Sequence, residues 1–408
     1  MSGLLIKGNK IYTEAGVIRG AVLIKGGRIQ SILTDAREAE PFNGSVVDAG
    51  DNAVLPGLID LHIHGGGGWQ LETTDPAAVR GFTRYLPSLG VTSFLPAVGG
   101  GTRDEIIGAL RCLSESMKDN SEGAKILGIH LEGPFINKNK KGAFAEERLL
   151  APSVEIMEEF MLASDNAIRY VSLAPELDGA YALIKYLTDR GVVVAGGHTD
   201  ASYEKTIEAI DNGVRVSTHT GNAQRGIHHR QPGALLAYLL DDRVYCELIA
   251  DFYHIHKAVV DMVIRLKSTD RVCLISDSVF VSNLQPGKYN FLGNVVTIDE
   301  EGWSRLDDGT IAGSTKSLLD GVKNIVQNLS YPLEEVTKMS SLNQARLLGI
   351  DNKKGSISVG KDADIIVLDE DFNLLYTFIE GELAFDYNRD KDRQLLNPAA
   401  GEFLISAG

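Results

Sequence analysis

Most histidines in this sequence stand directly after short apolar segments that have the composition of β-strands. One such segment ends in Asp60-Leu61-His62-Ile63-His64, and others end at or just before Glu132, His198, His219 and Asp277. Imidazole and carboxylate groups are ligands of catalytic divalent metal ions, which keep one coordination position open for water. These residue types in these places predict a hydrolytic metal site.

His62 and His64 are two positions apart on an expected strand. Because alternate residues of a strand point to the same side, both imidazoles can face one opening and share an ion. A pair with this spacing is more often an ordinary pair of core or surface histidines. Here the apolar residues 55–60 before the pair and the glycines at 65–68 after it are typical of the open end of a buried strand. We therefore assign both histidines to the metal site.

Glu132, His198 and His219 form a second set of candidate ligands. An unpaired carboxylate at the end of an apolar strand is costly, so Glu132 should bind a metal or, as the weaker alternative, pair with a lysine of 138–141. One carboxylate and two imidazoles leave a fourth position for water. Asp277 need not bind metal and can instead take the proton from the metal-activated water.

A barrel whose histidines only form hydrogen bonds is the plainer alternative for the whole set. Five candidate ligands at four strand ends favour the metal site. Other chemistries lack their motifs, since the sequence has no G-x-S-x-G elbow for a nucleophilic serine and no G-x-x-x-x-G-K-[ST] loop for a nucleotide.

The middle of the chain alternates between strand-like and helix-like segments. Strands are expected at 58–63, 92–98, 126–131, 169–173, 192–196, 215–218, 245–249 and 272–275. Helical periodicity follows at 75–89, 103–118, 153–163, 181–190, 203–212 and 257–268, and again at 322–329 and 332–348. Eight strands, most of them followed by a helix, predict an α/β fold, a (β/α)8 TIM barrel, in which functional residues lie at the carboxyl ends of the strands.

Both ends of the chain read as short strands between glycine-containing turns. Strands are expected at 4–6, 21–24 and 28–32, and at 355–357, 363–368 and 374–378. Neither end has enough strands for a stable sheet of its own. We therefore predict a discontinuous β-sandwich domain of residues 1–54 and 355–408 beside a barrel domain of residues 55–354, with an inserted hairpin at 287–313.

The composition excludes several classes of protein. A net charge of −15 disfavours binding to nucleic acid or to anionic membranes, because both need basic patches, although a local pocket can still take an anionic substrate. Cys112, Cys246 and Cys273 stand singly in apolar runs, which indicates buried free thiols. The sequence opens with no signal-like segment and has no run long enough to span a bilayer, so we expect a cytoplasmic protein.

The motifs together resemble the amidohydrolase superfamily. Segments 56–65 and 360–364 carry the resemblance to the superfamily as a whole. Segments 130–135, 197–199, 222–223, 228–233 and 312–314 narrow it to the family of N-acetylglucosamine-6-phosphate deacetylases. The resemblance covers essentially the whole chain.

This resemblance implies hydrolysis of the acetamide of an N-acetyl amino-sugar 6-phosphate, with N-acetylglucosamine 6-phosphate as the first candidate. Glu132, His198 and His219 would hold the principal ion, and His62 and His64 a second ion that Glu132 bridges. Asp277 would be the general base and then the acid. One or two divalent ions are expected, with zinc as the first candidate and iron, manganese and cobalt also suited to these ligands.

The resemblance also implies the residues that contact the substrate. They are Ala143, Asn222, Ala223, Arg230, His254, Ile311, Ala312 and Gly313. Arg230 suits a phosphate because its planar fork donates two parallel hydrogen bonds, whereas the alternative is an ordinary solvated arginine. Members of the family are commonly homodimers, so we expect a homodimer in which Arg230 or its neighbours can reach across the interface.

Three positions depart from the family's pattern. Phe144 stands where a histidine is usual, Phe252 where a glycine is usual, and Gln224 where a methionine is usual. We expect these changes to alter the wall that faces the sugar and the acyl group, which leaves the N-acyl substrate open. The alternatives are an enzyme for a different N-acyl sugar phosphate or a small cyclic amide, and a catalytically silent barrel with a structural or regulatory role.

Overall fold

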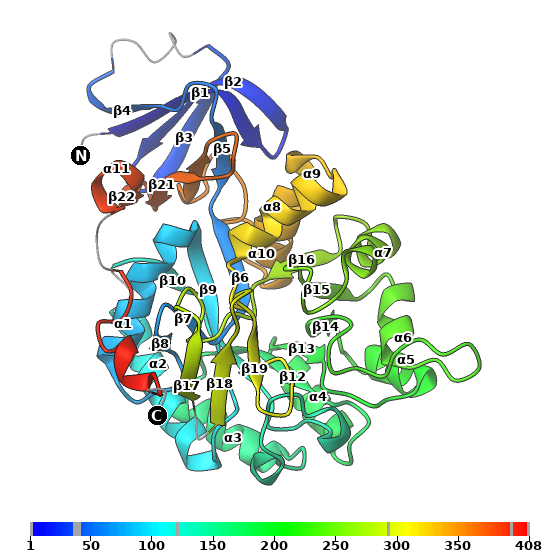
Figure 1. Ribbon diagram of the computed structural model, residues 1–408. Coiled ribbons are helices and arrows are strands. Elements are labelled where there is room, and N and C mark those ends of the chain that lie inside the picture. The colour runs from blue at the N-terminus through cyan, green and yellow to red at the C-terminus, as the bar shows by residue number, and fades with distance from the viewer. Residues whose placement is uncertain (1–2, 36–41, 120–121, 292–293, 392–394, 406–408) are drawn as a thin grey trace.

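The computed structural model describes residues 3–35, 42–119, 122–291, 294–391 and 395–405 of the chain. Its centre is a barrel of parallel strands surrounded by helices, and a second sheet lies at one end of the barrel (Figure 1). This architecture confirms the predicted TIM barrel with a smaller β-domain. No helix within the described ranges is long and apolar enough to cross a membrane.

The barrel strands are parallel and follow the order of the chain. They are β6 (Leu58–Ile63), β9 (Val91–Val98), β10 (Lys125–Ile126) with β11 (Ile129–Glu132), β12 (Ile168–Leu173), β13 (Val193–Gly196), β14 (Val216–Ser217), β15 (Tyr245–Ile249) and β16 (Val272–Ile275). The ring closes just after β16, where the backbone N–H of Asp277 donates to the carbonyl of His62 on β6 at 2.9 Å.

Helices cover the outside of the barrel and bury their apolar stripes against the strands. They are α1 (Pro76–Tyr85), α2 (Arg103–Lys118), α3 (Val154–Ala163), α4 (Ala180–Thr188), α5 (Tyr203–Asp211), α6 (Ala234–Leu240), α7 (Lys257–Lys267) and α8 (Leu318–Leu329). In α2, Ile106, Leu110 and Leu113 are buried at spacings of four and three residues, as in other amphipathic helices. A capping box of Thr102 and Glu105 begins this helix.

The last helical segment closes the end of the barrel where β6 begins. It consists of α9 (Leu333–Thr337), a π-helical turn (Lys338–Leu342) and α10 (Asn343–Leu347), where a single helix was expected at 332–348. Ala345 and Leu348 share a core cluster with Ile59 and Leu95 of the barrel interior. The other end of the barrel, at the carboxyl ends of the strands, is the end that carries the candidate ligands.

The remaining differences from the expected elements have local causes. The strand expected at 126–131 is interrupted at Gly128, whose φ is 155° and where a Cβ would lie 2.3 Å from a side-chain carbon of Arg169. The helix α6 is not predicted, because its seven residues carry no charged side chain that would reveal a helical period.

The second sheet combines strands from both ends of the chain. These are β1 (Gly3–Thr13), β2 (Gly16–Lys25), β3 (Arg28–Leu33), β4 (Gly44–Asp48), β5 (Ala53–Pro56), β20 (Ile365–Leu368), β21 (Leu374–Ile379) and β22 (Glu382–Asp386). The antiparallel pair β5 and β20 joins the two halves, which share one core. Residue 357 forms only a single bridge to Thr13, not the strand expected at 355–357. Residues 1–2, 36–41, 392–394 and 406–408 of the predicted domain lie outside the described ranges.

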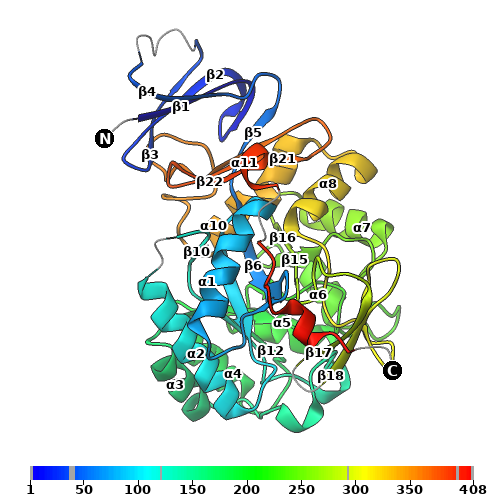
Figure 2. The same ribbon diagram turned by 60° about the vertical axis from the view of Figure 1, so that its left-hand side comes forward.

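Two further segments lie against the barrel. The insertion at 287–313, of which residues 292–293 are not described, forms three antiparallel strands: β17 (Gly287–Phe291), β18 (Asn294–Ile298) and β19 (Ser304–Leu306). The short α11 (Tyr387–Asp390) ends the β-domain, and residues 395–405 then run along the barrel to β17 (Figure 2). The chain end thus contacts the barrel, although residues up to 408 were predicted to belong to the β-domain.

Candidate metal centre and active site

The candidate ligands leave the barrel at the carboxyl ends of its strands. His62 lies on β6, His64 directly follows that strand, and Glu132 is the last residue of β11. His198, His219 and Asp277 follow β13, β14 and β16, and their φ angles of 45°, 25° and 49° lie in the left-handed region that non-glycine residues seldom adopt. Such backbone strain concentrates at functional sites, where the surrounding structure maintains it.

Glu132 stands at the centre of the site. Its Oε1 lies 3.2 Å from Nε2 of His198 and 3.0 Å from Nε2 of His219. Its Oε2 lies 3.3 Å from Nε2 of His62 and 3.1 Å from Nε2 of His64. One carboxylate therefore faces two pairs of imidazoles, one pair from each oxygen.

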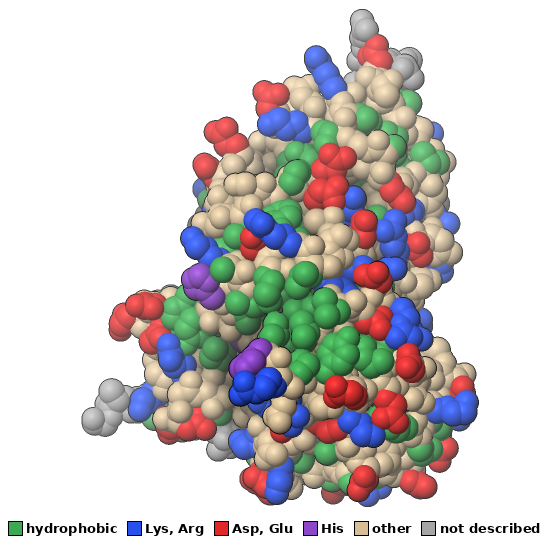
Figure 3. All heavy atoms as spheres, turned by 90° about the vertical axis from the view of Figure 1, so that its right-hand side faces the viewer, with side chains coloured by type: hydrophobic (Ala, Val, Ile, Leu, Met, Phe, Trp, Pro, Cys, Tyr) green, Lys and Arg blue, Asp and Glu red, His purple; other side chains and the backbone are tan. Residues whose placement is uncertain are grey.

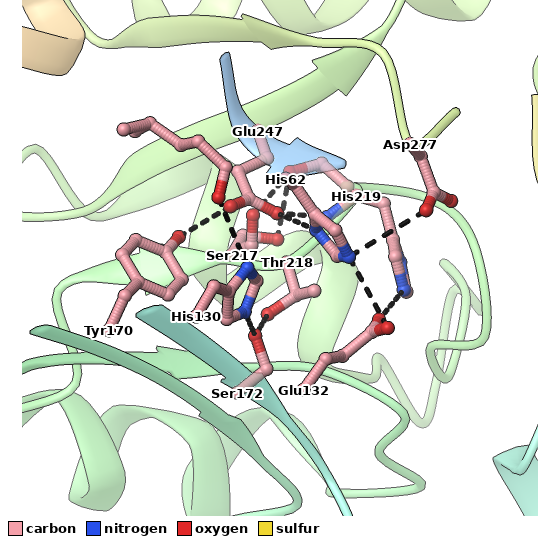
Figure 4. Close-up of polar contacts among 12 residues, drawn as sticks. His62, His130, Glu132, Tyr170, Ser172, Ser217, Thr218, His219, Glu247 and Asp277 are labelled. Atoms are coloured by element: carbon pink, nitrogen blue, oxygen red, sulfur yellow. Dashed lines mark hydrogen bonds and ion pairs between the residues drawn. The ribbon is translucent and has the colours of Figure 1, made fainter. Parts of the chain in front are cut away.

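The donor set fits divalent metal ions. In each of the triads His62–His64–Glu132 and Glu132–His198–His219, the candidate ligand atoms lie within 4.8 Å of one another. The Nε2 atom of His62 is buried and makes no hydrogen bond. It faces the carboxylates of Glu132 and Asp277 at 3.3 Å and 3.6 Å, where a metal ion could bind it (Figure 4). Two ions sharing Glu132, or one ion on either triad, would be compatible with these positions.

The electrostatics of the site call for positive charge. Burial alone would raise the pKa of Glu132, but the surrounding imidazoles hold that pKa well below its usual range. Burial would likewise lower the pKa of His64, but Asp277 and Glu132 raise it to about 9. In the metal-free protein the raised pKa values of His62, His64 and His219 favour protons on these imidazoles, and a divalent cation would take the place of those protons.

Asp277 lies at the edge of this cluster and opens onto a cavity. Its Oδ1 lies 3.6 Å from Nε2 of His62 and 3.4 Å from Nε2 of His64. Burial alone would raise its pKa, whereas His62 and His64 lower it to about 2, so the group is held as an ionised base. The backbone N–H of Ser314 donates to the Asp277 carbonyl at 2.8 Å and fixes the residue from the side of the insertion.

A cavity of about 430 Å³ opens above the cluster. Seven of the eight predicted substrate residues line it: Ala143, Asn222, Ala223, His254, Ile311, Ala312 and Gly313. Asp251 accepts a hydrogen bond from Nδ1 of His254 at 2.7 Å, which fixes the direction of that ring.

Arg230 is the predicted substrate residue that does not line this cavity. It is exposed on the loop between α5 and α6, and its guanidinium contacts Nε2 of His229 at 2.7 Å. Within one chain, the structure does not bring Arg230 to the other candidate residues.

The three departures from the family pattern lie in different places. Phe144 lines the cavity and meets the ring of His198 edge-on, with 5.1 Å between ring centroids. The expectation that Phe252 and Gln224 change the same wall is wrong, because neither is among the lining residues. Phe252 packs against the barrel core, and Gln224 donates to the hydroxyl of Ser217 at 3.0 Å.

Two carboxylates near the site, the buried Glu247 and the partly buried Glu72, are not predicted from the sequence. Glu247 on β15 contacts Nδ1 of His62 at 3.1 Å from beneath the cluster. Glu72 lines the cavity, and its carboxylate accepts three backbone N–H bonds from residues 99–101 at 2.5–3.0 Å. The one available signal is a glutamate within the apolar strand 245–249, which is costly in a barrel interior unless it has partners.

The chain matches two family models. Residues 53–384 match the amidohydrolase family, and residues 3–52 match the allantoinase composite domain.

Curated relatives match nearly the whole chain. An N-acetylglucosamine-6-phosphate deacetylase of Bacillus subtilis (strain 168) is 34% identical over 386 residues, which cover 94% of this chain and 97% of that protein. An N-acetylgalactosamine-6-phosphate deacetylase of Escherichia coli O157:H7 is 32% identical over 381 residues, with coverage of 93% and 99%.

Solved structures of deacetylases have the same fold as this chain. An N-acetylglucosamine-6-phosphate deacetylase from Pasteurella multocida has a TM-score of 0.87 and 29% identity, and the match covers 93% of this chain and 99% of that one. A variant of the Mycobacterium smegmatis enzyme in complex with N-acetyl-D-glucosamine-6-phosphate has a TM-score of 0.88 and 28% identity, with coverage of 94% and 100%.

Proposed function

Since the chain belongs to the amidohydrolase family, we propose that it hydrolyses the acetamide of N-acetylglucosamine 6-phosphate to glucosamine 6-phosphate and acetate. The observation that carries this proposal is that a deacetylase for this substrate matches 94% of the chain. The cluster around Glu132, with Asp277 beside it at the floor of one cavity, supplies the groups that such a reaction needs.

Asp277 is the proposed general base and acid. A divalent ion at Glu132 and the imidazoles would polarise the acyl oxygen and allow water to attack near neutral pH. The ionised Asp277 carboxylate accepts the proton of the attacking water as the new C–O bond forms. It then returns this proton to the amine nitrogen, which would otherwise leave as an unstable anion when the C–N bond breaks.

The metal is proposed to be zinc, with iron, manganese and cobalt as alternatives. Imidazole nitrogen and carboxylate oxygen are suitable ligands for all four metals, so the ligand set alone does not choose among them. We propose two ions, because Glu132 presents one oxygen to His198 and His219 and the other to His62 and His64.

The lining of the cavity supports a phosphorylated amino-sugar as substrate. We assign the sugar to the wall of Ile311, Ala312 and Gly313, with His254 held toward it by Asp251. Asn222 and Ala223 also line the cavity and would hold the phosphate end together with an arginine.

We propose that Arg230 reaches the phosphate of a neighbouring subunit in a homodimer. Such a contact is compatible with the exposure of Arg230 on the loop between α5 and α6. Apolar side chains gather on the face of the molecule seen in Figure 3. Ile227 on the loop before α6 and Leu240 at the end of α6 are 50% and 54% exposed. Covering such a patch is a common reason for subunits to associate.

The predicted domain boundaries and the cellular location also belong to this proposal. We propose a β-domain built from both chain ends and a barrel domain between them, close to the predicted division into residues 1–54 with 355–408 and residues 55–354. The pairing of β5 with β20 supports this division, but β5 extends the β-domain to residue 56 and residues 395–405 lie against the barrel. A cytoplasmic location is supported by the three cysteines, all of which are free.

The activity is tested by following amine release from a panel of substrates with metal-loaded protein. The panel contains N-acetylglucosamine 6-phosphate, N-acetylgalactosamine 6-phosphate and unphosphorylated N-acetylglucosamine, and protein stripped of metal is the control. The proposal predicts fastest hydrolysis of the first compound. The galactosamine isomer is the competing substrate, because a relative named for it is 32% identical. No release from any phosphorylated sugar by metal-loaded protein would reject the proposed reaction.

A further inference from the structure

Glu247 lies beneath the candidate metal cluster, and its side chain is completely buried on β15. Three groups donate to its carboxylate. Oε2 faces Nδ1 of His62 at 3.1 Å and accepts the backbone N–H of His219 at 3.0 Å. Oε1 accepts the hydroxyl of Tyr170 at 2.6 Å (Figure 4). Glu247 therefore touches one member of each candidate ligand triad.

The contact with His62 fixes which ring nitrogen faces the cluster. When Nδ1 carries the proton that is donated to Glu247, the Nε2 lone pair is directed at the space between Glu132 and Asp277. A carboxylate behind a ligating imidazole also makes that imidazole a stronger base, and removal of such a partner commonly weakens metal binding about 10–100-fold.

The contact with His219 acts on its backbone. The φ angle of His219 is 25°, a strained value that persists only where neighbouring groups hold it. The bond from its N–H to Glu247 is one such restraint, and the imidazole is thereby directed at Oε1 of Glu132, 3.0 Å away.

Packing alone does not account for this carboxylate. The neighbours of Glu247 on the strand are Cys246 and Leu248, both fully buried, and an ionised group in such surroundings costs stability unless it is paired. A buried hydrocarbon would fill the space at lower cost. The charged carboxylate accepts hydrogen bonds from the two histidines, His62 and His219.

We propose that Glu247 is a positioning residue, which fixes the tautomer and direction of His62 and thereby sets the affinity of the ion that His62 binds. This inference rests on the metal site of the proposed function and does not depend on the substrate. It assigns to Glu247 no contact with the substrate or with the reacting atoms.

The test compares cobalt binding in four proteins: wild type, Glu247→Gln, His62→Ala and Asp364→Asn. Metal-stripped protein is titrated with Co²⁺, whose visible absorption reports the ligands, and bound metal is counted by equilibrium dialysis. The variant His62→Ala defines the part of binding that depends on His62. Asp364 is a matched control, because it is also a buried carboxylate with a direct partner, Lys354, but it lies in the β-domain.

The Glu247→Gln protein should lose about 10–100-fold in affinity for the His62-dependent ion. The remaining ion should keep its absorption spectrum, because the glutamine amide oxygen can still accept the backbone N–H of His219. The control Asp364→Asn should bind cobalt as the wild type does. As a second readout, the exchangeable ring N–H of His62 in the cobalt protein should give a hyperfine-shifted proton signal in wild type. In Glu247→Gln this signal should shift, because the neutral amide oxygen is a weaker acceptor of that N–H than the carboxylate.

Three results would overturn the proposal. The first is cobalt affinity in Glu247→Gln equal to that of wild type. The second is an equal loss for both ions together with a lowered thermal midpoint of the metal-free protein, which indicates a merely structural role. The third is unchanged binding in His62→Ala. If cobalt binding follows the prediction while no N-acetyl sugar phosphate is hydrolysed, the proposed substrate fails and the role of Glu247 stands.

Discussion

Each carboxylate oxygen of Glu132 faces two imidazoles, which makes this residue the point where both candidate ion positions meet. The same residue is 3% exposed, so its charge is not screened by bulk water. Its neighbours His62, His64 and His219 consequently have raised pKa values, and burial works against each of these shifts. The stability of the metal-free protein should therefore depend on pH.

The first prediction concerns the pH dependence of stability without metal. Burial alone would lower the pKa of His64, but Asp277 and Glu132 raise it from 6.5 to about 9. Because the folded value is the higher one, its stabilising contribution is complete below pH 6.5 and is lost as the pH rises toward 9. The folded pKa of Asp277, about 2, lies below its usual 3.8, so its contribution is lost as the pH falls from 3.8 toward 2.

The thermal midpoint of metal-free protein should therefore be highest at mildly acidic pH and fall between about pH 6.5 and 9. Scanning calorimetry across this range measures it, and His64→Ala should show a smaller decline. A midpoint that rises over the same range would contradict the assigned charge states.

The second prediction concerns Phe144, the departure from the family pattern that lines the cavity. Its ring meets that of His198, so it limits the space beside the metal cluster. Phe144→Ala should raise kcat/KM for N-propionyl relative to N-acetyl substrate by about tenfold, the usual effect of one methylene group in a pocket. Phe252→Ala is the control and should leave this ratio unchanged. An equal change in both variants would show that the ratio does not report the cavity wall.

At the scale of elements, the sequence predicts the barrel well because its signal is repeated. Eight apolar strands recur, an expected amphipathic helix follows seven of them, and each such unit supports the interpretation of the next. The predicted elements differ from the structure where a single residue interrupts a strand, as Gly128 does, or where a helix such as α6 lacks a polar face.

The candidate site is predictable only where residue type and strand position coincide. His62, His64, Glu132, His198, His219 and Asp277 all meet that condition. Glu72 does not stand out, because its donors are distant in sequence, the backbone N–H groups of residues 99–101. Glu247 is marked only by its place within an apolar strand, and its contacts with His62 and His219 appear only in the folded chain. The proposed role of Arg230 requires a second chain, and a family motif alone does not separate Phe144 from Phe252.

The third prediction concerns the insertion, whose strands supply Val296 and Leu306 to the cavity wall. Trp303 joins this insertion to the loop after β15 by stacking on Tyr253, with 4.1 Å between centroids and 5° between planes. Such a pair is worth about 0.5–1.5 kcal/mol, so Trp303→Ala should raise KM roughly 2–10-fold with little change in metal content. Steady-state kinetics measures this.

Tyr253→Phe is the matched control for that stack. Its hydroxyl is buried and makes no hydrogen bond, so the phenylalanine keeps the stacking and should keep the wild-type KM. If Tyr253→Phe and Trp303→Ala changed KM alike, the effect would come from the hydroxyl or from general disruption and not from the stack.

At the scale of the whole molecule, segments distant in sequence brace the site. The indole N–H of Trp69 donates to the carbonyl of Leu395 at 3.1 Å, and the side chain of Asn397 donates to the carbonyl of Gly68 at 2.9 Å. The chain end thus holds the glycine-rich loop that follows His64. The exposed Arg230 is the part of the proposed site that one chain leaves incomplete.

The fourth prediction tests whether Arg230 acts across subunits. Arg230→Ala should raise KM about 10–100-fold, the loss of a hydrogen bond to a charged group, with kcat less affected. After subunit exchange, a mixture of inactive Asp277→Asn with Arg230→Ala should regain high-affinity activity. In the mixed dimer, one site combines an intact Asp277 with the intact Arg230 of the other chain. Failure to regain activity in exchanged dimers, or a monomer by light scattering, would contradict an arginine supplied in trans.

The most direct test of the central claim is the rate of amine release from N-acetylglucosamine 6-phosphate by wild type and by Asp277→Asn at equal metal content. Asp277 is assigned to the proton transfers and not to metal binding. The variant should therefore bind the same amount of metal and lose about 10²–10⁴-fold in kcat. A variant that retains kcat within tenfold of wild type with metal bound would contradict the assignment of Asp277 as the base and acid of this hydrolysis.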